Sequence, residues 1–404
     1  MSRRWLIPEV IQTSAMDCGP AASAPTWTAR RYNAAPVASM DPDRTLARAV
    51  AAHERAVVSR AAGRFAEAER DCRRAADGYA RAEGARSPDL ANALVELGRV
   101  LEARDRLMDA VRCHRRALAI LARAPRHPDF TRLAIEARLA LAGVLRTRGA
   151  LSEADRLNRA ALAAARRLGP RDPLVATALN NLGVLRKAQG RYAEAVACYR
   201  RAAPLLPRRD REARATLHHN LGGIAHAQGR LAEAEPHARR AVSLRQAALG
   251  PHHPKVAADV AALAAVVEAR GRLGAAAQLY RRAAAVFARR LGAGSLEAGL
   301  TAAGLAAVEQ QRGRTAEARA LYRRAIPVLE RKLGRDHADV ALTVNNLAVL
   351  EQASGRPRAA AALFRRAAAS FARSLGPRHP HSRLAHNNLK TIEKRLKSVP
   401  ITSR

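Results

Sequence analysis

A turn followed by the start of a helix recurs eight times along this 404-residue chain. The clearest copy reads GRYAEA and begins at residue 190. The turn residue is glycine in seven copies and aspartate in one, at Gly63, Asp105, Gly149, Gly190, Gly229, Gly271, Gly313 and Gly355. Successive copies lie 39 to 44 residues apart. A fixed period in that range is typical of a stacked array in which each repeat is one supersecondary unit.

Small residues occupy the same places in every copy. The fifth and the twelfth residue after each turn are alanine in all eight copies, and the seventh residue before it is glycine or alanine. Small side chains on two consecutive helices let the backbones approach closely, and a larger residue would overpack the contact at a cost of about 1–3 kcal/mol. The pattern therefore predicts that each repeat is a tight antiparallel pair of helices.

The composition favours stacked helices over a compact core, because the 48% hydrophobic content is mostly alanine and only 3% of the residues are aromatic. We predict an all-α fold, an α-solenoid of about eight helix pairs over residues 41–398, with a charged capping helix from His381 to Lys397 at its end. Residues 1–40 do not follow the repeat and are expected to be disordered. Residues 399–404 are expected to be a frayed tail.

The repeat resembles the tetratricopeptide repeat, which the small residues and two sets of large side chains indicate. One set stands two residues after the turn, at Phe65, Leu107, Leu151, Tyr192, Leu231 and Leu273, and the other nine after it, at Tyr199, Tyr280, Tyr322 and Phe364. The spacing near 42 residues, the Leu-Gly-Pro-x-His-Pro linkers and the Leu-Asn-Asn-Leu runs are similar to kinesin light chain repeats in particular. Thr315 and Pro357 depart from the pattern. The resemblance implies a right-handed superhelix.

The same resemblance implies a peptide-binding groove lined by the first helix of each pair. In that family an asparagine just before a conserved leucine commonly bonds the backbone of an extended peptide, and the matching residues here are Asn181, Asn220, Asn346 and Asn388. An amide offers both a donor and an acceptor, as a peptide backbone does. Lys187 and His219 would add positive charge at the edge. The alternative is that these amides bond the neighbouring repeat or water.

The formal charge is +36, from 71 basic and 35 acidic residues, and all but six of the basic residues are arginine. Seven repeats carry an arginine pair ten and eleven residues after the turn, at Arg73-Arg74, Arg115-Arg116, Arg200-Arg201, Arg239-Arg240, Arg281-Arg282, Arg323-Arg324 and Arg365-Arg366. They precede the buried alanine, so helical periodicity directs them outward. This stripe is either a solvated face or a surface for a polyanion, nucleic acid or an acidic protein.

Residues 7–22 resemble the opening of a C39 cysteine peptidase domain of the kind found beside bacterial exporters. In that family the residues matching Gln12 and Cys18 would be the oxyanion-hole donor and the nucleophile. A thiol protease needs a histidine to activate its cysteine, but the first histidine is His53, inside the array. We therefore interpret residues 1–40 as a truncated remnant, or as sequence upstream of a true start at Met40, rather than as an active peptidase.

No phosphate-binding, zinc-protease or nucleophile-elbow motif occurs in the sequence. The histidines do not combine with cysteine or carboxylate at ligand spacing, so we expect no metal and no cofactor. The four cysteines lack CxxC spacing, which favours free thiols and a cytoplasmic location. No apolar run is long enough for a membrane span. The sequence predicts a non-catalytic scaffold that binds a protein or peptide partner.

Overall fold

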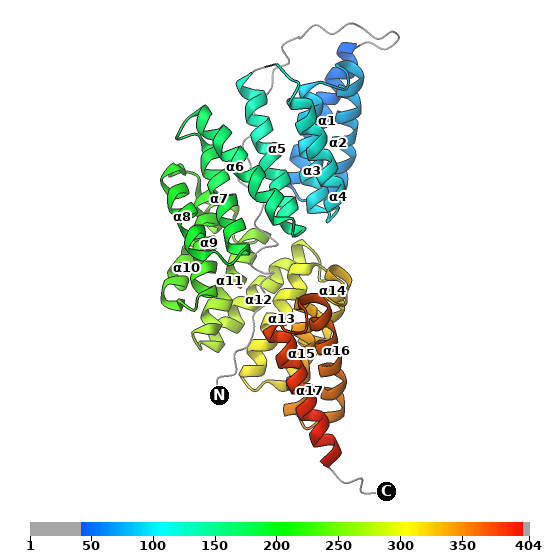
Figure 1. Cartoon of the computed structure of the whole chain (residues 1–404), viewed down its shortest axis with the longest axis vertical. Coiled ribbons are helices and arrows are strands. Elements are labelled where there is room, and N and C mark those ends of the chain that lie inside the picture. The colour runs from blue at the N-terminus through cyan, green and yellow to red at the C-terminus, as the bar shows by residue number, and fades with distance from the viewer. Residues whose placement is uncertain (1–41, 126, 399–404) are drawn as a thin grey trace. The chain divides into compact units, whose positions relative to one another are not determined.

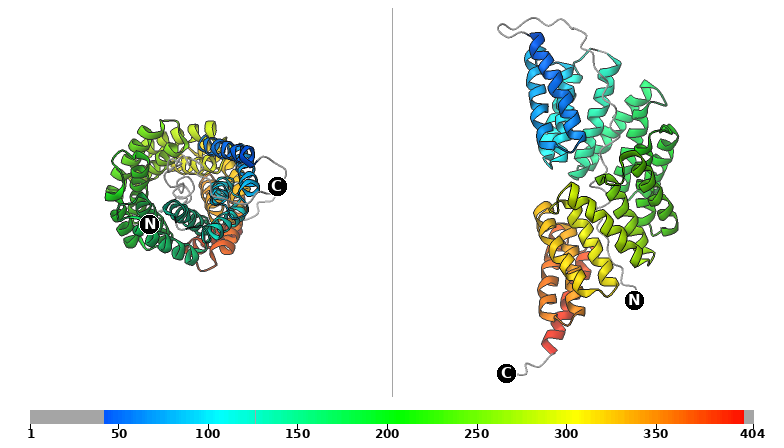
Figure 2. Two further views of the ribbon diagram at one scale, coloured as in Figure 1. Left: turned by 90° about the horizontal axis from the view of Figure 1, so that it is seen from above. Right: turned by 180° about the vertical axis from the view of Figure 1, so that it is seen from behind.

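A computed structural model describes residues 42–125 and 127–398, and Figure 1 shows that its regular elements are helices. These residues fall into two compact units, 42–208 and 209–398. Within each unit consecutive helices pack against one another (Figure 2). The predictions of an all-α fold and of helix pairs are confirmed.

The unit of residues 42–208 holds four helix pairs. Its helices are α1 (Pro42–Ala61), α2 (Phe65–Ala82), α3 (Pro88–Ala103), α4 (Leu107–Leu121), α5 (Pro128–Thr147), α6 (Leu151–Leu168), α7 (Pro173–Ala188) and α8 (Tyr192–Ala202). A short 3-10 turn, η2 (Ala203–Leu205), follows α8. Odd-numbered helices are the first helices of their pairs, and α3, α5 and α7 each pack on their own second helix and on the second helix of the pair before.

The unit of residues 209–398 holds four more pairs and a single last helix. Its helices are α9 (Arg211–Ala227), α10 (Leu231–Leu249), α11 (Pro254–Ala269), α12 (Leu273–Arg290), α13 (Leu296–Gln311), α14 (Thr315–Leu333), α15 (Ala338–Ala353), α16 (Pro357–Leu375) and α17 (Pro380–Ser398). Helix α17 packs on α16, as predicted for a capping helix. Thr315 and Pro357 each begin a regular second helix, so neither departure breaks the pattern.

The repeated turn closes every first helix in the same way. The residue after the turn glycine donates its backbone N–H to the carbonyl five residues earlier, for example Arg64 to Ser59 at 2.8 Å and Arg191 to Arg186 at 2.8 Å. This bond is typical of a Schellman ending, which needs a left-handed residue. Asp105 adopts this conformation, with φ of 61°, where the other copies have glycine.

The linker histidines begin the next first helix. The Nδ1 atoms of His127, His253, His337 and His379 accept the backbone N–H two residues later at 3.1–3.3 Å. Ser87 and Asp172 do the same with side-chain oxygens at 3.0 and 2.9 Å. The Leu-Gly-Pro-x-His-Pro linkers therefore end one helix and cap the next, because a side-chain acceptor satisfies a backbone donor that the helix cannot.

In two repeats, a glycine on the first helix leaves space for an aromatic ring of the second helix. A Cβ atom added to Gly183 would lie 2.4 Å from Cε1 of Tyr199, and one added to Gly98 would lie 2.4 Å from Cε1 of His114. Both pairs join the position seven before the turn to the position nine after it. The small residue predicted there is therefore required by the ring that packs over it.

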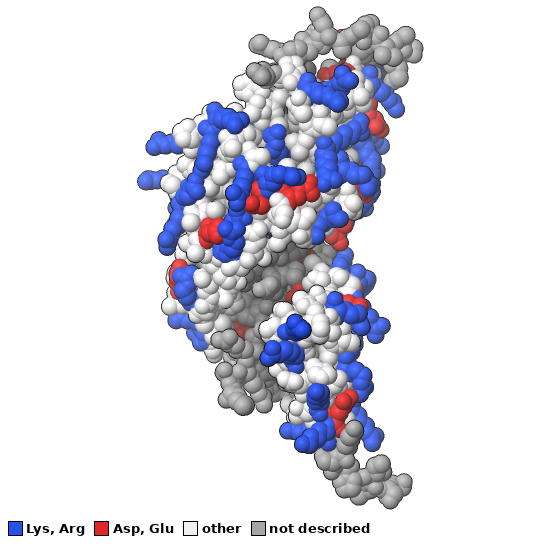
Figure 3. All heavy atoms as spheres, viewed as in Figure 1, with Lys and Arg blue, Asp and Glu red and all other residues white. Residues whose placement is uncertain are grey.

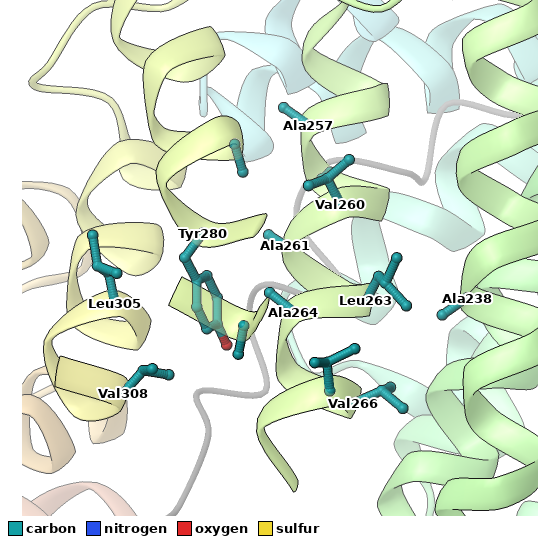
Figure 4. Close-up of a cluster of buried hydrophobic side chains, with 14 of the residues drawn as sticks. Ala238, Ala257, Val260, Ala261, Leu263, Ala264, Val266, Tyr280, Leu305 and Val308 are labelled. Carbon is teal, nitrogen blue, oxygen red and sulfur yellow. The ribbon is translucent and has the colours of Figure 1, made fainter. Parts of the chain in front are cut away.

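The largest apolar cluster lies in the unit of residues 209–398. Figure 4 shows Tyr280 of α12 between Ala261 and Ala264 of α11 and Leu305 and Val308 of α13. All five side chains are nearly or fully buried. Alanine lets α11 and α12 approach, and larger side chains from the next repeat fill the remaining space, so the core continues from one repeat to the next.

Candidate interaction surfaces

One of the four predicted asparagines lies in the unit of residues 42–208. Asn181 and Lys187 lie on α7, and both side chains are half-buried. Arg146 lies in the last turn of α5, at the place that Lys187 occupies in the next repeat, three residues before the turn. Burial lowers the pKa of the Arg146 guanidinium. Two consecutive repeats thus place a basic side chain at the same position.

Residues 209–398 carry the other three predicted asparagines. Asn220 on α9 and Asn346 on α15 are each 7% exposed, and Asn388 on α17 is half-buried. Asn346 hydrogen-bonds the hydroxyl of Tyr322, which belongs to the repeat before it. At this position the amide contacts the neighbouring repeat, which is the alternative that the sequence left open. Asn181 and Asn220 belong to different compact units.

His219, predicted at the edge of the groove, lies in a buried polar network. Its side chain is 4% exposed, and its Nδ1 atom is 2.9 Å from a carboxylate oxygen of Asp259 on α11. The other carboxylate oxygen accepts Nε of Arg245 on α10 at 2.7 Å. Arg245 is 1% exposed and also donates to Thr216 at 3.2 Å. The network ties α9, α10 and α11 together.

Sequence reasoning missed Arg245 and Asp259, although the repeat register holds a signal for both. Arg245 stands sixteen residues after its turn, where other repeats have Tyr79, Leu121, Phe287, Leu329 and Phe371. Asp259 stands twelve before its turn, where the other repeats have alanine, threonine or, once, leucine. A charged residue in an apolar column is a candidate for a buried ion pair when an opposite charge appears in the adjoining repeat.

Two further histidines meet beside this network. The Nδ1 atoms of His218 on α9 and His237 on α10 are 2.9 Å apart, so one ring donates to the other. Burial and His237 lower the pKa of His218 to about 4. A hollow between α9, α10 and α11, lined by residues that include His219 and His226, has about 10 Å³ of free space. That is room for about one water molecule, not for a small-molecule substrate.

The arginine pairs point outward, as the sequence predicts. Thirteen of the fourteen side chains are exposed, and Arg366 is half-buried. Lys and Arg clearly outnumber Asp and Glu on the face that Figure 3 shows. Several pairs meet carboxylates, such as Arg115 with Glu153 at 2.9 Å and Arg281 with Glu309 at 2.8 Å. With the described residues, seven of the fourteen form no ion pair: Arg116, Arg200, Arg201, Arg240, Arg282, Arg323 and Arg324.

Buried carboxylates join consecutive repeats at their turns. Glu69, six residues after its turn, accepts Arg104 and Arg106, which flank the next turn, the latter at 2.7 Å. Glu235 holds the equivalent position and accepts Arg270 at 2.5 Å and Arg272. Removing water from these carboxylates is costly unless they are paired. Part of the arginine excess therefore serves the packing of repeats.

The described residues do not contain a helix long and apolar enough to span a bilayer. They also do not contain a group of three or more histidine, cysteine, aspartate or glutamate side chains arranged to hold a metal ion. The peptidase-like residues Gln12 and Cys18 lie outside the part of the chain that the structure describes. The interpretation of residues 1–40 thus remains a prediction.

The sequence matches the family profile described as the tetratricopeptide repeat, over residues 47–123, 133–208, 213–289 and 298–373. A comparison with curated proteins gave no match. The apo form of the quorum sensor NprR from B. thuringiensis is 14% identical, covers 80% of this chain and 87% of its own, and has a TM-score of 0.58. The apo form of RapI is 11% identical, with coverage of 76% and 87% and a TM-score of 0.53. Kinesin light chain repeats from Podospora anserina are 22% identical, with coverage of 45% and 85% and a TM-score of 0.40.

Proposed function

Because the chain belongs to the tetratricopeptide repeat family, we propose that it is a non-catalytic scaffold that binds a protein partner through an extended peptide. The observation that carries the proposal is the recurrence of an asparagine nine residues before the turn on α7, α9 and α15, and at the matching place on α17. An amide in that position can both donate to and accept from a peptide backbone.

The peptide would be held chiefly where a basic residue stands near the amide. Lys187 follows Asn181 on α7 and is the basic residue that would meet the ligand, whereas His219, which precedes Asn220 on α9, is engaged by Asp259. The contact of His219 with Asp259 would then fix the helix that presents Asn220, rather than meet the ligand directly. Helices α11 and α13 carry Ala262 and Gly304 in the amide position and would supply only shape and apolar contact. A ligand would therefore be anchored locally instead of along every repeat.

Selection from a displayed library of random peptides tests the proposal on the full chain. Peptides that bind the unaltered protein should bind Asn181→Ala or Asn220→Ala about two- to thirteenfold more weakly, because each change loses a hydrogen bond worth about 0.5–1.5 kcal/mol. Gln278→Ala is the matched control, since this amide is exposed on the second helix α12. Equal binding to all four proteins, or no enriched peptide, would contradict the proposal.

The outer arginines support a second candidate function, the binding of a polyanion. The favouring observation is that seven exposed arginines of the pairs form no ion pair with a described residue, although other arginines of the pairs meet carboxylates. Excess surface charge of one sign attracts oppositely charged partners at long range. Retention on immobilised heparin at physiological salt is the expected result, and elution in the void volume would refute this second candidate.

A further inference from the structure

Side-chain contacts join the second helices of residues 209–398 into one surface. Arg282 of α12 donates to Gln246 of α10 at 2.9 Å, and Arg281 of α12 pairs with Glu317 of α14 at 2.8 Å. Arg366 of α16 pairs with Glu330 of α14. Because each contact bridges residues about one repeat apart, α10, α12, α14 and α16 lie side by side with their outer faces continuous.

On α12 and α14 every carboxylate is in an ion pair, and several exposed cations have no ion-pair partner among the described residues. Helix α12 contains no acidic residue, and both acidic residues of α14, Glu317 and Glu330, are in ion pairs. The described residues supply no ion-pair partner for seven exposed cations of these two helices, which are Arg282, Arg289, Arg290, Arg323, Arg324, Arg331 and Lys332. The surplus is therefore concentrated on α12 and α14.

The surplus cations recur in the repeat register. Arginine stands eleven and eighteen residues after the turn on α12, at Arg282 and Arg289, and on α14, at Arg324 and Arg331. Seven residues of helix bring a side chain back to nearly the same direction, about 10.5 Å further along the axis. Each helix thus presents two arginines in line, on adjoining helices of one surface.

The chemistry of this surface suits a phosphate backbone better than a protein. Protein interfaces depend on large apolar or aromatic anchors at their centre. Of the exposed large hydrophobic residues of this unit, Leu375 and Leu384 lie outside α12 and α14, and Leu291 lies at the C-terminal end of α12, not at the centre of the surface. Tyr280 and Tyr322 are fully buried, so they cannot stack on bases. Guanidinium groups pair with phosphate oxygens in bidentate geometry.

We infer that the outer face of α12 and α14 binds the phosphate backbone of double-stranded nucleic acid without regard to sequence. This inference rests on the second candidate function, polyanion binding, and names its partner and its place. It is independent of the peptide proposal, because the cations lie on second helices and the amides on first helices. Binding of this kind releases counterions and therefore weakens steeply with salt.

The test uses the full chain and fluorescent 20-base-pair DNA duplexes of two unrelated sequences, titrated at several salt concentrations. The variant R323Q/R324Q/R331Q/K332Q removes the free cations of α14 and keeps good helix formers at exposed positions. Its affinity should fall about tenfold or more on both sequences. The slope of log K against log salt should decrease by about 0.9 for each phosphate that the variant no longer neutralises. The smaller variant R324Q/R331Q should lie between this variant and the unaltered protein.

The control variant carries the same change in net charge at arginines that already have carboxylate partners, which are Arg230, Arg239, Arg314 and Arg373 changed to glutamine. It should bind DNA nearly as the unaltered protein does. Circular dichroism melts of all variants establish that they are folded. Equal weakening by the control would show that net charge, and not the face of α12 and α14, determines binding.

Other outcomes separate this inference from the function on which it rests. Retention on heparin without DNA binding would overturn nucleic acid as the partner and leave polyanion binding in place. DNA binding that the α14 variant does not weaken would overturn the location. Competition by polyglutamate as strong as that by DNA of equal charge would instead indicate an acidic protein. Loss of both heparin and DNA binding would refute polyanion binding itself.

Discussion

The buried ion pair between α10 and α11 allows a quantitative test of how this array is held together. Replacing Arg245 by methionine keeps most of the side-chain volume but removes the guanidinium that faces Asp259 at 2.7 Å. Asp259 is 1% exposed, so its carboxylate would keep only the contact with His219. The chain would then hold an incompletely paired charge inside the fold, where water cannot solvate it.

The magnitude follows from the cost of leaving one member of a buried ion pair behind, about 3–5 kcal/mol. Because His219 still contacts Asp259, we expect Arg245→Met to cost about 3 kcal/mol, at the lower end of that range. The double variant Arg245→Met/Asp259→Ala removes the orphaned charge and places alanine where Ala137 and Ala178 stand in other repeats. Its stability should return to within about 1 kcal/mol of the unaltered protein, or exceed it.

Amide hydrogen exchange in the full chain is the suitable assay, because repeat arrays do not unfold as one two-state unit. Peptides from α9, α10 and α11 report the free energy of local opening, and peptides from α16 serve as an internal reference. The four proteins of the double-mutant cycle should give a coupling energy of about 2 kcal/mol or more. A single variant that costs less than about 1 kcal/mol, or single effects that simply add, would refute this account of the network.

Three further changes test the repeat itself. Gly183→Ala should lower the melting temperature, since its Cβ would meet Tyr199 at 2.4 Å and overpacking costs about 1–3 kcal/mol. Gly143→Ala should leave the melting temperature unchanged, because the added Cβ would have open space around it. Equal effects of the two changes would contradict the packing of the Tyr199 ring against Gly183. Burial lowers the pKa of His114 from 6.5 to about 3. Between these pH values the unfolded chain binds a proton that the folded chain does not bind, so the free energy of unfolding falls as the pH drops from 6.5 to about 3. In urea unfolding, His114→Phe should reduce the loss of stability at low pH. If the variant and the unaltered protein lose stability equally as the pH falls, His114 is not the cause. Asp105→Gly should stabilise the protein by about 0.5–1 kcal/mol and raise its melting temperature, because the φ of 61° at this position strains a residue with a side chain. A melting temperature below that of the unaltered protein would show that the aspartate side chain stabilises the turn.

Much of the fold could be predicted from the sequence because its determinants are local. The turn glycines, the alanines of the helix pair and the periodicity of the arginine pairs each depend on residues within one repeat. Helical geometry alone places Arg323 and Arg324 on the outside when Ala325 is buried, as the structure confirms. Even the role of His253 as a helix cap is implicit in the Pro that follows it at the first helical position.

The candidate sites depend on contacts between repeats, and these the sequence could not resolve. The repeat register shows Arg245 and Asp259 as exceptions, but only the packing of α10 on α11 brings them to 2.7 Å and includes His219. Likewise, Arg323 and Arg281 occupy the same position in their repeats. Arg281 meets Glu309 and Glu317, and Arg323 has no ion-pair partner among the described residues.

Sequence period therefore determined which helices form, how they end and which face of each is buried, because backbone geometry and side-chain size act over one or two turns. Tertiary structure decided which charges are matched. An ion pair between repeats requires two side chains from different helix pairs to meet within 4 Å, and no local rule specifies that distance. The surface left for a partner is what remains after these pairings, so it emerges only when the repeats are stacked.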